Sequence, residues 1–358
     1  SLITSNFFVM NPSNVNSKEF EEHSSGTLSD YVTAIAWSPD GTTLAGASAA
    51  GEVALWENGS IEILQAGSGE SVDCIAFSRD GQFLAVGGQD GRVKIWRESE
   101  LITTLENAPA WVDRLAWNPT NNQLAFSLGR YVQIWDADSN KIVASLNFEN
   151  SSVLGIDWRN DGNFLAISGY KAVKVWNSQN WDEEPCVMDM PTVSVAMGWS
   201  PDGKYIAAGN MDLSVTVWEW NNPDPWIMRG FPGKIRKLAW SDINTEIGAP
   251  LLASSSVEGI VVWQKSADES LGWEARVLTN HVGIIQAIAF APKSFLLASA
   301  ASDGWLCLWN KANRVSQVLT GVATGFSCLA WHPQGKMLAA GGESGEIFIW
   351  SKVSQGQS

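Results

Sequence analysis

The sequence predicts an all-β repeat protein, and three observations support this fold class. An apolar, β-rich run ends on a tryptophan eight times, at intervals of 39 to 46 residues. A second aromatic series precedes the first by 18 to 23 residues. Between the two anchors, the units share short apolar runs separated by Gly-containing turns. The anchors of units 1 to 8 are, in order, Trp37 and Trp56, Phe77 and Trp96, Trp117 and Trp135, Trp158 and Trp176, Trp199 and Trp218, Trp240 and Trp263, Phe290 and Trp309, and Trp331 and Trp350.

Each unit divides into four predicted strands. In unit 1, residues 36–41 read Ala-Trp-Ser-Pro-Asp-Gly, a second apolar run covers 44–48, and a third covers 53–56. A fourth run, such as residues 61–64 or 141–146, precedes the next aromatic anchor. Four strands in a period of about 40 residues are typical of one blade of a β-propeller.

These units resemble those of WD-repeat proteins, which run from a Gly-His pair through Leu-Ala-Phe-Ser-Pro-Asp-Gly and an Asp-Gly turn to Leu-Trp-Asp. The resemblance covers Trp37 to Trp350 and recurs eight times. The chain departs from the pattern in two ways. Only Trp135-Asp136 keeps the final dipeptide, and the Gly-His pair is nearly absent.

The two ends of the chain predict how the ring closes. Only eight residues follow Trp350, too few for a good fourth strand, whereas Ser17 to His23 stand where a fourth strand should be. We expect this segment to pair with the last three strands, which leaves no open sheet edge. The prediction is one propeller of eight four-stranded antiparallel blades over residues 17–353, with an N-terminal extension (1–16) and a C-terminal tail (354–358). The alternative is seven blades, with one aberrant unit packed elsewhere.

Composition narrows the classes of partner. A net charge of -15 argues against nucleic acid and favours proteins or peptides of basic or mixed charge. No run of eighteen apolar residues exists, so no membrane insertion is expected. The four cysteines lack metal-ligand spacing and are interpreted as small buried hydrophobic residues, consistent with a cytoplasmic location. We expect no cofactor and no metal, and a monomer until a partner binds.

One unit carries a fuller polar pattern. His281, Ser299, Asp303 and Trp309 match, position by position, the buried hydrogen-bond tetrad of WD-repeat proteins. The set superficially resembles a Ser-His-Asp triad, but the resemblance implies that it is buried within a blade and faces no substrate. The sequence has no Gly-x-Ser-x-Gly, no phosphate loop and no His-Glu-x-x-His, so no enzymatic activity is expected.

Six tryptophans fall outside both anchor series, and most of them indicate one face of the ring. Four lie between a third and a fourth strand in units 4 to 6, and the insertion at 241–250 joins a first to a second strand. These connections emerge on the same face of a propeller, which we name the insertion face. Its candidate partner-binding residues are Trp181, Trp220, Trp273, Asp224 and Ile243. The alternative is that these tryptophans pack on the outer strands, and we favour it for Trp226.

The opposite face, which we name the channel-mouth face, offers a second candidate surface. Aromatic and charged residues precede first strands or follow the turns between second and third strands. WD-repeat proteins commonly bind peptides at this face, and an aromatic rim with mixed charge fits a short peptide. The candidates are Tyr31, Trp111, Asp113, Tyr131, Lys234, Arg236 and Trp305.

Three functions follow from these surfaces. The first is a non-catalytic scaffold that assembles protein partners on the faces of a rigid ring. The second is a reader of one short linear peptide motif at the channel mouth. The third is a propeller enzyme, which would need a converged set of perturbed carboxylates or a bound metal.

Overall fold

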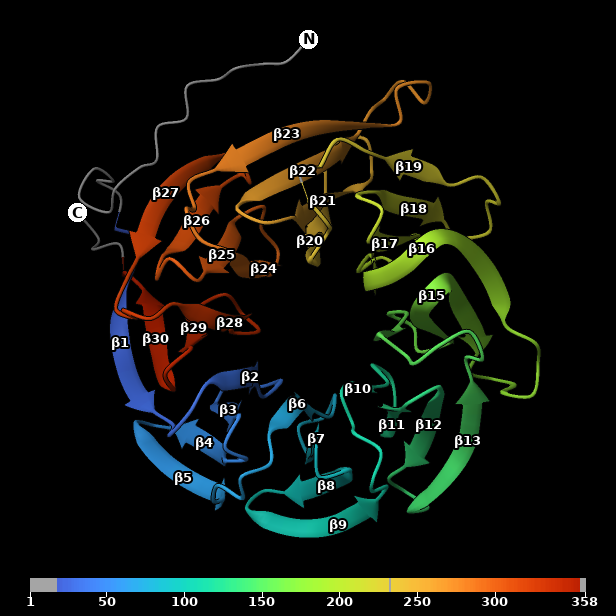
Figure 1. Cartoon of the computed structure of the whole chain (residues 1–358). Coiled ribbons are helices and arrows are strands. Elements are labelled where there is room, and N and C mark those ends of the chain that lie inside the picture. Colours follow the sequence, from blue (N-terminus) through green and yellow to red (C-terminus); the bar gives the residue numbers. More distant parts are fainter. Residues whose placement is uncertain (1–17, 232, 355–358) are drawn as a thin grey trace.

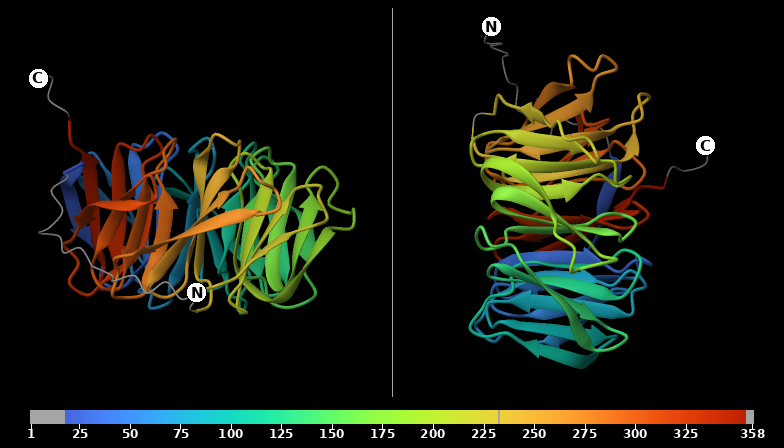
Figure 2. Two further views of the ribbon diagram at one scale, coloured as in Figure 1. Left: turned by 90° about the horizontal axis from the view of Figure 1, so that it is seen from above. Right: turned by 90° about the vertical axis from the view of Figure 1, so that its right-hand side faces the viewer.

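The computed structural model describes residues 18–231 and 233–354, which form thirty strands and no helix. The strands radiate from a central channel, with the innermost strand of each unit at the channel wall (Figure 1). Seen edge-on, the molecule is a thick ring (Figure 2). In the described part of the chain, no helix is long and apolar enough to cross a membrane.

The two inner strands of the units follow one another around the ring. The first strands are β2 (Val32–Trp37), β6 (Val72–Phe77), β10 (Leu115–Trp117), β14 (Gly155–Trp158), the second half of β16 (Cys186–Trp199), β20 (Lys237–Asn244), β24 (Ile285–Phe290) and β28 (Phe326–Trp331). The second strands are β3 (Thr43–Ser48), β7 (Phe83–Gly88), β11 (Gln123–Leu128), β15 (Phe164–Asn177), β17 (Tyr205–Asn210), β21 (Pro250–Ser255), β25 (Leu297–Ala301) and β29 (Met337–Gly342).

The two outer strands complete each unit. The third strands are the second half of β15, β4 (Val53–Glu57), β8 (Arg92–Arg97), β12 (Tyr131–Asp136), β18 (Val215–Glu219), β22 (Gly259–Lys265), β26 (Leu306–Asn310) and β30 (Glu346–Lys352). The outermost strands are the first half of β16, β1 (Phe20–Thr27), β5 (Ser60–Gln65), β9 (Glu100–Glu106), β13 (Lys141–Asn147), β19 (Trp226–Met228), β23 (Trp273–Thr279) and β27 (Arg314–Leu319).

The described strands form seven hydrogen-bonded sheets instead of the eight separate four-stranded blades that the sequence predicts. Six sheets have four strands, and one sheet, β14 to β19, has six. This sheet arises because β15 and β16 are each 14 residues long and continue where other units have breaks. Counted by its sheets, the propeller is therefore seven-bladed, as in the alternative prediction.

No unit is packed outside the ring, however. The buried core divides into eight hydrophobic clusters, and each cluster draws its residues from two neighbouring units. The cluster between units 4 and 5, for example, joins Val173 and Val175 to Ile206 and Ala208. The aberrant feature is thus a fusion of units 4 and 5 within one sheet.

The predicted closure by an N-terminal strand is confirmed. Strand β1 pairs antiparallel with β30, from Phe20 opposite Lys352 to Thr27 opposite Glu346. Phe20 is buried beside Trp331, with ring centroids 5.7 Å apart. The side chain of Gln317 in β27 accepts from the backbone N–H of Phe20 at 2.9 Å and donates to its carbonyl at 2.7 Å. The observed strand starts three residues later than expected, and Ser17 lies outside the described residues.

The second aromatic series, which ends the first strands, links five of the eight units to the unit before each of them. The indole Nε1–H of Trp117 donates to the carbonyl of Ala76 at 3.0 Å, and Ala76 precedes the anchor of unit 2. The same bond recurs at four other junctions. The remaining pairs are Trp37 to Ala330, Trp158 to Ala116, Trp240 to Gly198 and Trp331 to Ala289, at 3.0 to 3.1 Å. These five bonds explain why a tryptophan, and not only an apolar ring, occupies this position.

The junction between units 4 and 5 lacks this bond. The indole nitrogen of Trp199 is buried and has no hydrogen-bond partner among the described residues. Asp157, which stands where other units have Ala or Gly, accepts instead from the backbone N–H of Trp199 at 2.8 Å. Burial raises the pKa of Asp157 to about 7, although that hydrogen bond acts in the opposite direction.

The indole bonds predict a difference between two matched Trp→Phe substitutions. Trp117 and Trp199 are similarly buried, at 8% and 6% exposure, but only Trp117 has an indole partner. Trp117→Phe is expected to cost about 1 kcal/mol more in the free energy of unfolding than Trp199→Phe. Urea denaturation followed by circular dichroism measures both values. Equal losses would show that the indole bonds contribute nothing to stability.

The carboxyl of Asp157 predicts a pH-dependent stability. Because its folded pKa is raised, the folded protein holds this proton to about pH 7 while the unfolded chain releases it near pH 4. The free energy of unfolding should therefore fall as pH rises through this window. Asp157→Asn should raise the melting temperature by about 2 to 4 °C at pH 8 and leave it nearly unchanged at pH 4.

The neighbouring Asp161 supplies a control of opposite sign. The hydrogen bond from Arg159 lowers the pKa of Asp161, so its charge stabilises the folded state at neutral pH. Asp161→Asn should consequently lower the melting temperature at pH 8. An Asp157→Asn variant that loses stability at pH 8 as Asp161→Asn does would contradict the interpretation of Asp157.

Candidate functional site: the two faces of the propeller

On the insertion face, the tryptophans outside the anchor series pack against anchors of the second series. Trp181 meets Trp158 edge-to-face at a centroid distance of 5.8 Å and remains half-buried. Trp220 is also half-buried, packed against Trp199 at 5.1 Å and Phe164 at 5.0 Å. These two indoles therefore cover the ends of the core and present only part of their surface.

The expectation that Trp273 is available at this face is wrong. Trp273 is only 6% exposed and meets Tyr205, Trp226 and Trp240 at 5.6, 6.2 and 6.0 Å. It begins the outermost strand β23 and seals the core between units 5 and 6, so it is a packing residue. Trp226 joins the same cluster, as expected of a residue on an outer strand.

The insertion at 241–250 extends the hairpin of β20 and β21. Asn244 pairs with Pro250, and Asp242 accepts from the backbone N–H of Lys293 in unit 7 at 2.7 Å. Ile243 is half-buried, whereas Ile247 at the tip is exposed. The candidate Asp224 is exposed in the loop between β18 and β19.

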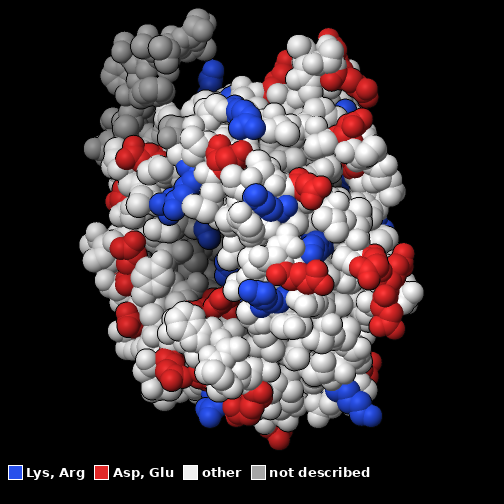
Figure 3. Space-filling model, turned by 45° about the vertical axis from the view of Figure 1, so that its right-hand side comes forward, with Lys and Arg blue, Asp and Glu red and all other residues white. Residues whose placement is uncertain are grey.

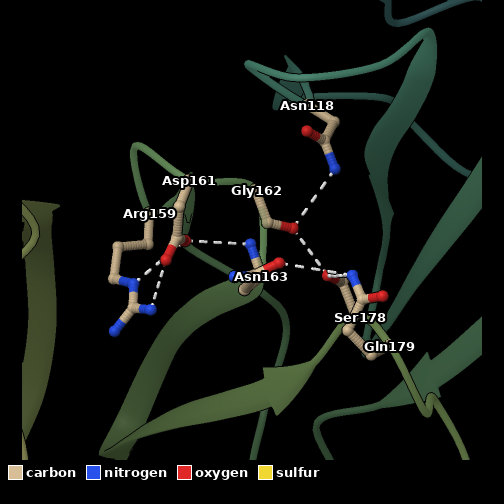
Figure 4. A network of polar contacts seen from close by, with 7 residues as sticks. All are labelled: Asn118, Arg159, Asp161, Gly162, Asn163, Ser178 and Gln179. Carbon is tan, nitrogen blue, oxygen red and sulfur yellow. Dashed lines mark hydrogen bonds and ion pairs between the residues drawn. The ribbon is translucent and has the colours of Figure 1, made fainter.

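Polar contacts join neighbouring turns on the insertion face (Figure 4). The carbonyl of Gly162 accepts from the amide of Asn118 in unit 3 at 3.3 Å and from the hydroxyl of Ser178 at 2.6 Å. Asp161 binds Arg159, whose guanidinium also stacks 4.5 Å from the centroid of Phe164. These contacts hold the turns of units 3 and 4 together, and the loop that carries Trp181 follows directly.

A cavity of about 660 Å³ lies beside Trp220. Its apolar walls come from the start of the outermost strand of unit 4, with Val187 and Met188, and from the Pro223 to Pro225 loop of unit 5. Val187 is 51% exposed. This cavity borders Trp220, one of the candidate residues of the insertion face.

On the channel-mouth face, each connection between units lies against the turn between a second and a third strand. Val112 donates its N–H to Gly88 of unit 2 at 2.9 Å, and Val153 donates to Gly129 of unit 3 at 2.8 Å. Met211 likewise donates to Val193 at 3.0 Å. Loops and turns therefore form one continuous rim.

Large apolar side chains stand out from this rim over units 3 to 5. Trp111 is 56% exposed, and Tyr131 is 45% exposed at the first position of β12. Three residues not singled out from the sequence extend the set across units 4 and 5. They are Tyr170, Met211 and Leu213, with exposures of 43%, 45% and 40%. We call these five residues the apolar arc.

The remaining candidates on this face differ in accessibility. Lys234 and Asp113 are exposed, whereas Tyr31 and Arg236 are half-buried. Trp305 is also half-buried, because its ring packs against the core cluster of units 6 and 7. Burial, together with Cys328 and Glu343, raises the pKa of Tyr31, so this phenol remains neutral. Lys and Arg side chains and acidic side chains both lie at the edge of the hollow near the middle of the ring (Figure 3).

Candidate metal ligands do not cluster among the described residues of either face. In residues 18–231 and 233–354, no group of three or more His, Cys, Asp or Glu is arranged to hold a metal ion. All four cysteines are free, and burial raises the pKa of the Cys74 and Cys328 thiols. The prediction that all four are buried is wrong for Cys186, which is exposed.

Comparison with known proteins decides the family. The family described as WD domain, G-beta repeat (WD40) matches residues 15–57, 60–97, 140–177, 189–219, 272–310 and 314–351, more than half of the chain. The chain belongs to the WD40 family. Proteins of this family are generally non-catalytic and bind other proteins.

Several WD40 relatives share parts of the chain. Protein FIZZY-RELATED 3 of Arabidopsis thaliana is 24% identical over 213 residues, which cover 58% of this chain and 42% of that protein. Protein HIR1 of Cryptococcus neoformans is 33% identical over 117 residues, covering 30% of this chain and 13% of that protein. WD repeat-containing protein VIP3 of Arabidopsis thaliana is 28% identical over 138 residues, which cover 34% of this chain and 43% of that protein. The chain thus spans less than half the length of these relatives.

The WD40 tetrad of unit 7 is assembled as the resemblance implies. His281 Nδ1 lies 2.9 Å from a carboxylate oxygen of Asp303, and Nε2 lies 2.7 Å from Ser299 Oγ. The indole of Trp309 donates to the same hydroxyl at 2.9 Å. Asp303 also accepts from the backbone N–H of Trp305 at 2.9 Å. His281, Ser299 and Trp309 are buried, so the set stabilises a turn and faces no substrate.

The pair His281 and Asp303 predicts a pH-dependent contribution to stability. Burial alone would lower the pKa of His281, but the hydrogen bond to Asp303 and the nearby Cys307 outweigh it and raise the pKa to about 9. The stabilisation is therefore complete below about pH 6.5, the unfolded pKa, and is lost as pH rises through 9. His281→Gln should cost about 3 kcal/mol at pH 6 and much less at pH 9.5, measured by chemical denaturation. A cost that does not change with pH would contradict the charged pair.

Proposed function

We propose that the chain is a non-catalytic scaffold that assembles protein partners through the channel-mouth face. The apolar arc is the observation that carries this proposal. Five large apolar side chains, each at least 40% exposed, stand on the loops and turns of units 3 to 5. Exposed apolar patches that include Trp and Tyr are the parts of a surface that gain most from being covered by another protein.

The rigid rim supports this assignment. The loops of the arc are tied to neighbouring turns by backbone hydrogen bonds, such as Val112 to Gly88 and Val153 to Gly129. Lys171 lies 5.3 Å from the ring centroid of Tyr170 and so restricts that side chain. A preorganised surface loses less conformational entropy on binding, which favours docking of a folded partner or an extended peptide.

The chemistry of the partners follows from the charge of the chain. With a net charge of -15, the ring attracts proteins or peptides with basic regions and repels nucleic acid. The four free cysteines fit a reducing compartment, so we place the scaffold in the cytoplasm. Before a partner binds, the proposed state is a monomer.

A second docking area is proposed at the insertion face. The cavity beside Trp220 has apolar walls from Val187, Met188 and Pro223 and could receive one side chain of a partner. Two exposed apolar residues, Ile247 and Leu271, stand near the tips of insertion-face loops. A scaffold with both areas would hold two partners on opposite faces of one ring.

The proposal predicts which substitutions release partners. Trp111→Ala with Tyr131→Ala should reduce the yield of co-purified partners at least fivefold, because both side chains are solvent-exposed anchors. Tagged wild-type and variant chains are expressed in cells of the native host, cross-linked and compared by quantitative mass spectrometry. The matched control is Ile61→Ala with Ile63→Ala, which removes equally exposed side chains from the outer strand β5.

Two results would contradict the choice of face. The first is an unchanged partner yield from the Trp111/Tyr131 variant when its melting temperature matches the wild type. The second is a loss of partners confined to Ile247→Ala with Leu271→Ala, which would assign docking to the insertion face.

A further inference from the structure

Three cations meet inside the channel mouth of this acidic protein. Arg114 immediately precedes β10 of unit 3, and Arg236 and Lys237 stand at the start of β20 of unit 6. All three occupy the channel-mouth ends of first strands. They fall in residues 98–139 and 220–271, the stretches of the ring between the segments that the WD40 family matches, so the repeat itself does not require them.

None of the three cations is neutralised by an ion pair among the described residues. Ion pairs of Lys and Arg within 4.0 Å in the described ranges use Lys18, Arg92, Arg159 and Arg229. The guanidinium of Arg114 donates instead to the backbone carbonyls of Leu154 and Asp113, both at 3.1 Å. Such contacts orient Arg114 without forming an ion pair.

Arg236 contributes an unused donor. Its Nε is fully shielded from solvent and has no hydrogen-bond partner in the described part of the chain. A buried N–H without an acceptor is energetically unfavourable, and an anionic ligand would offer Arg236 an acceptor. The backbone N–H of Arg236 is bonded to Ser255 at 2.8 Å, so the strand holds the residue in place.

The charge of Lys237 interacts with the charges of the other two cations. Desolvation first, and then the positive charges of Arg114 and Arg236, lower the pKa of Lys237. The ammonium group also interacts with the thiol of Cys328 in unit 8. Lys237 is therefore within electrostatic range of charged or polar groups from units 3, 6 and 8, and the residue remains solvent-accessible.

Two acidic residues, Asp73 and Asp113, lie near Arg114 at the same mouth. Asp73 in unit 2 accepts from the hydroxyl of Ser71 at 2.7 Å. Burial, and then the negative charge of Asp113, raise its pKa, while Arg114 acts in the opposite direction. The acids thus repel each other on units 2 and 3, while the cations gather from units 3 and 6. The mouth is polarised, with an excess of positive charge toward unit 6.

We propose that Arg114, Arg236 and Lys237 form an anion-binding site inside the channel mouth, which takes a carboxylate or phosphate group of a docked peptide segment. Arginine binds such groups through two parallel N–H donors, and a lysine adds a point charge. The apolar arc lies on the same face and would hold the apolar residues of that segment. The inference deepens the proposed scaffold function and relies on it for the identity of the ligand as a protein.

Fluorescence anisotropy with labelled peptides tests the site on the full chain. The probes are hexaglutamate, a Gly-Ser peptide with one phosphoserine, the same peptide without phosphate, and hexalysine. We expect the two anionic probes to bind better than the unphosphorylated peptide, and their ranking separates a carboxylate ligand from a phosphate ligand. Arg114→Gln with Arg236→Gln and Lys237→Gln should weaken their binding at least tenfold. Lys237→Gln alone, on an accessible side chain, should weaken it at least threefold if the triple variant does not fold.

A matched control keeps the net charge equal. Lys141→Gln with Arg314→Gln and Lys352→Gln removes three exposed cations from strands away from the channel, on β13, β27 and β30. This control should bind the anionic probes within twofold of the wild type. The proposal is wrong if neither anionic probe binds, if the control variant loses as much as the channel variant, or if a labelled oligonucleotide binds more tightly than both peptides.

These experiments test the anion site and the docking surface independently. Loss of partners from the Trp111/Tyr131 variant without binding of an anionic probe would leave docking intact and remove the anion site. Binding of the probes with unchanged partner yields would keep the anion site and remove the apolar arc as the docking surface.

Discussion

The hydrogen bond from a first-strand indole to the backbone of the preceding unit is the interaction on which the ring depends. A four-stranded sheet has two apolar faces, and each face is covered only if the next unit sits at the correct angle and height. An indole that donates to one particular carbonyl, as Trp117 donates to Ala76, fixes both the angle and the height of the next unit. Five of the eight junctions are tied in this way, and the strand β1 completes unit 8 by pairing with β30. The ring is consequently a rigid platform, and its exposed connections carry the functional differences.

The junction of units 4 and 5 is the exception within this frame. The long strands β15 and β16 join the two units through the backbone, while Asp157 occupies the place of a small residue and the indole of Trp199 has no partner. A buried carboxyl with a pKa near 7 makes this junction sensitive to protonation. Two residues of the apolar arc, Tyr170 and Met211, stand on the turns of these same units. The least regular junction of the ring thus lies beneath the surface that we assign to partners.

Much of the fold could be predicted from the sequence because the repeat encodes it directly. The period of Trp56 to Trp350 predicts the units, and the polar pattern around His281 predicts the tetrad. The number of separate sheets could not be predicted, because strand continuity across residues 164–177 depends on backbone geometry and not on the anchors. The burial of individual tryptophans could not be predicted either. Trp111 and Trp273 are both outside the anchor series, yet Trp111 is exposed and Trp273 completes the core cluster between units 5 and 6. The sequence around Tyr170 resembles the Gly-Arg-Tyr turn of unit 3, so the exposure of Tyr170 could have been predicted. The proximity of Arg114 to Lys237 could not, because it depends on closure of the ring.

Hydrogen–deuterium exchange of the complex with a co-purified partner is the most direct test of the assignment of the channel-mouth face. Amide exchange is compared, residue segment by residue segment, between the free chain and the purified complex. If partners dock on the channel-mouth face, protection should appear at residues 107–114, 129–131, 169–171 and 210–213, while the insertion-face loops 178–185 and 243–249 exchange as in the free chain. Protection confined to 178–185, 220–226 and 243–249 would contradict the assignment and place the partner on the insertion face.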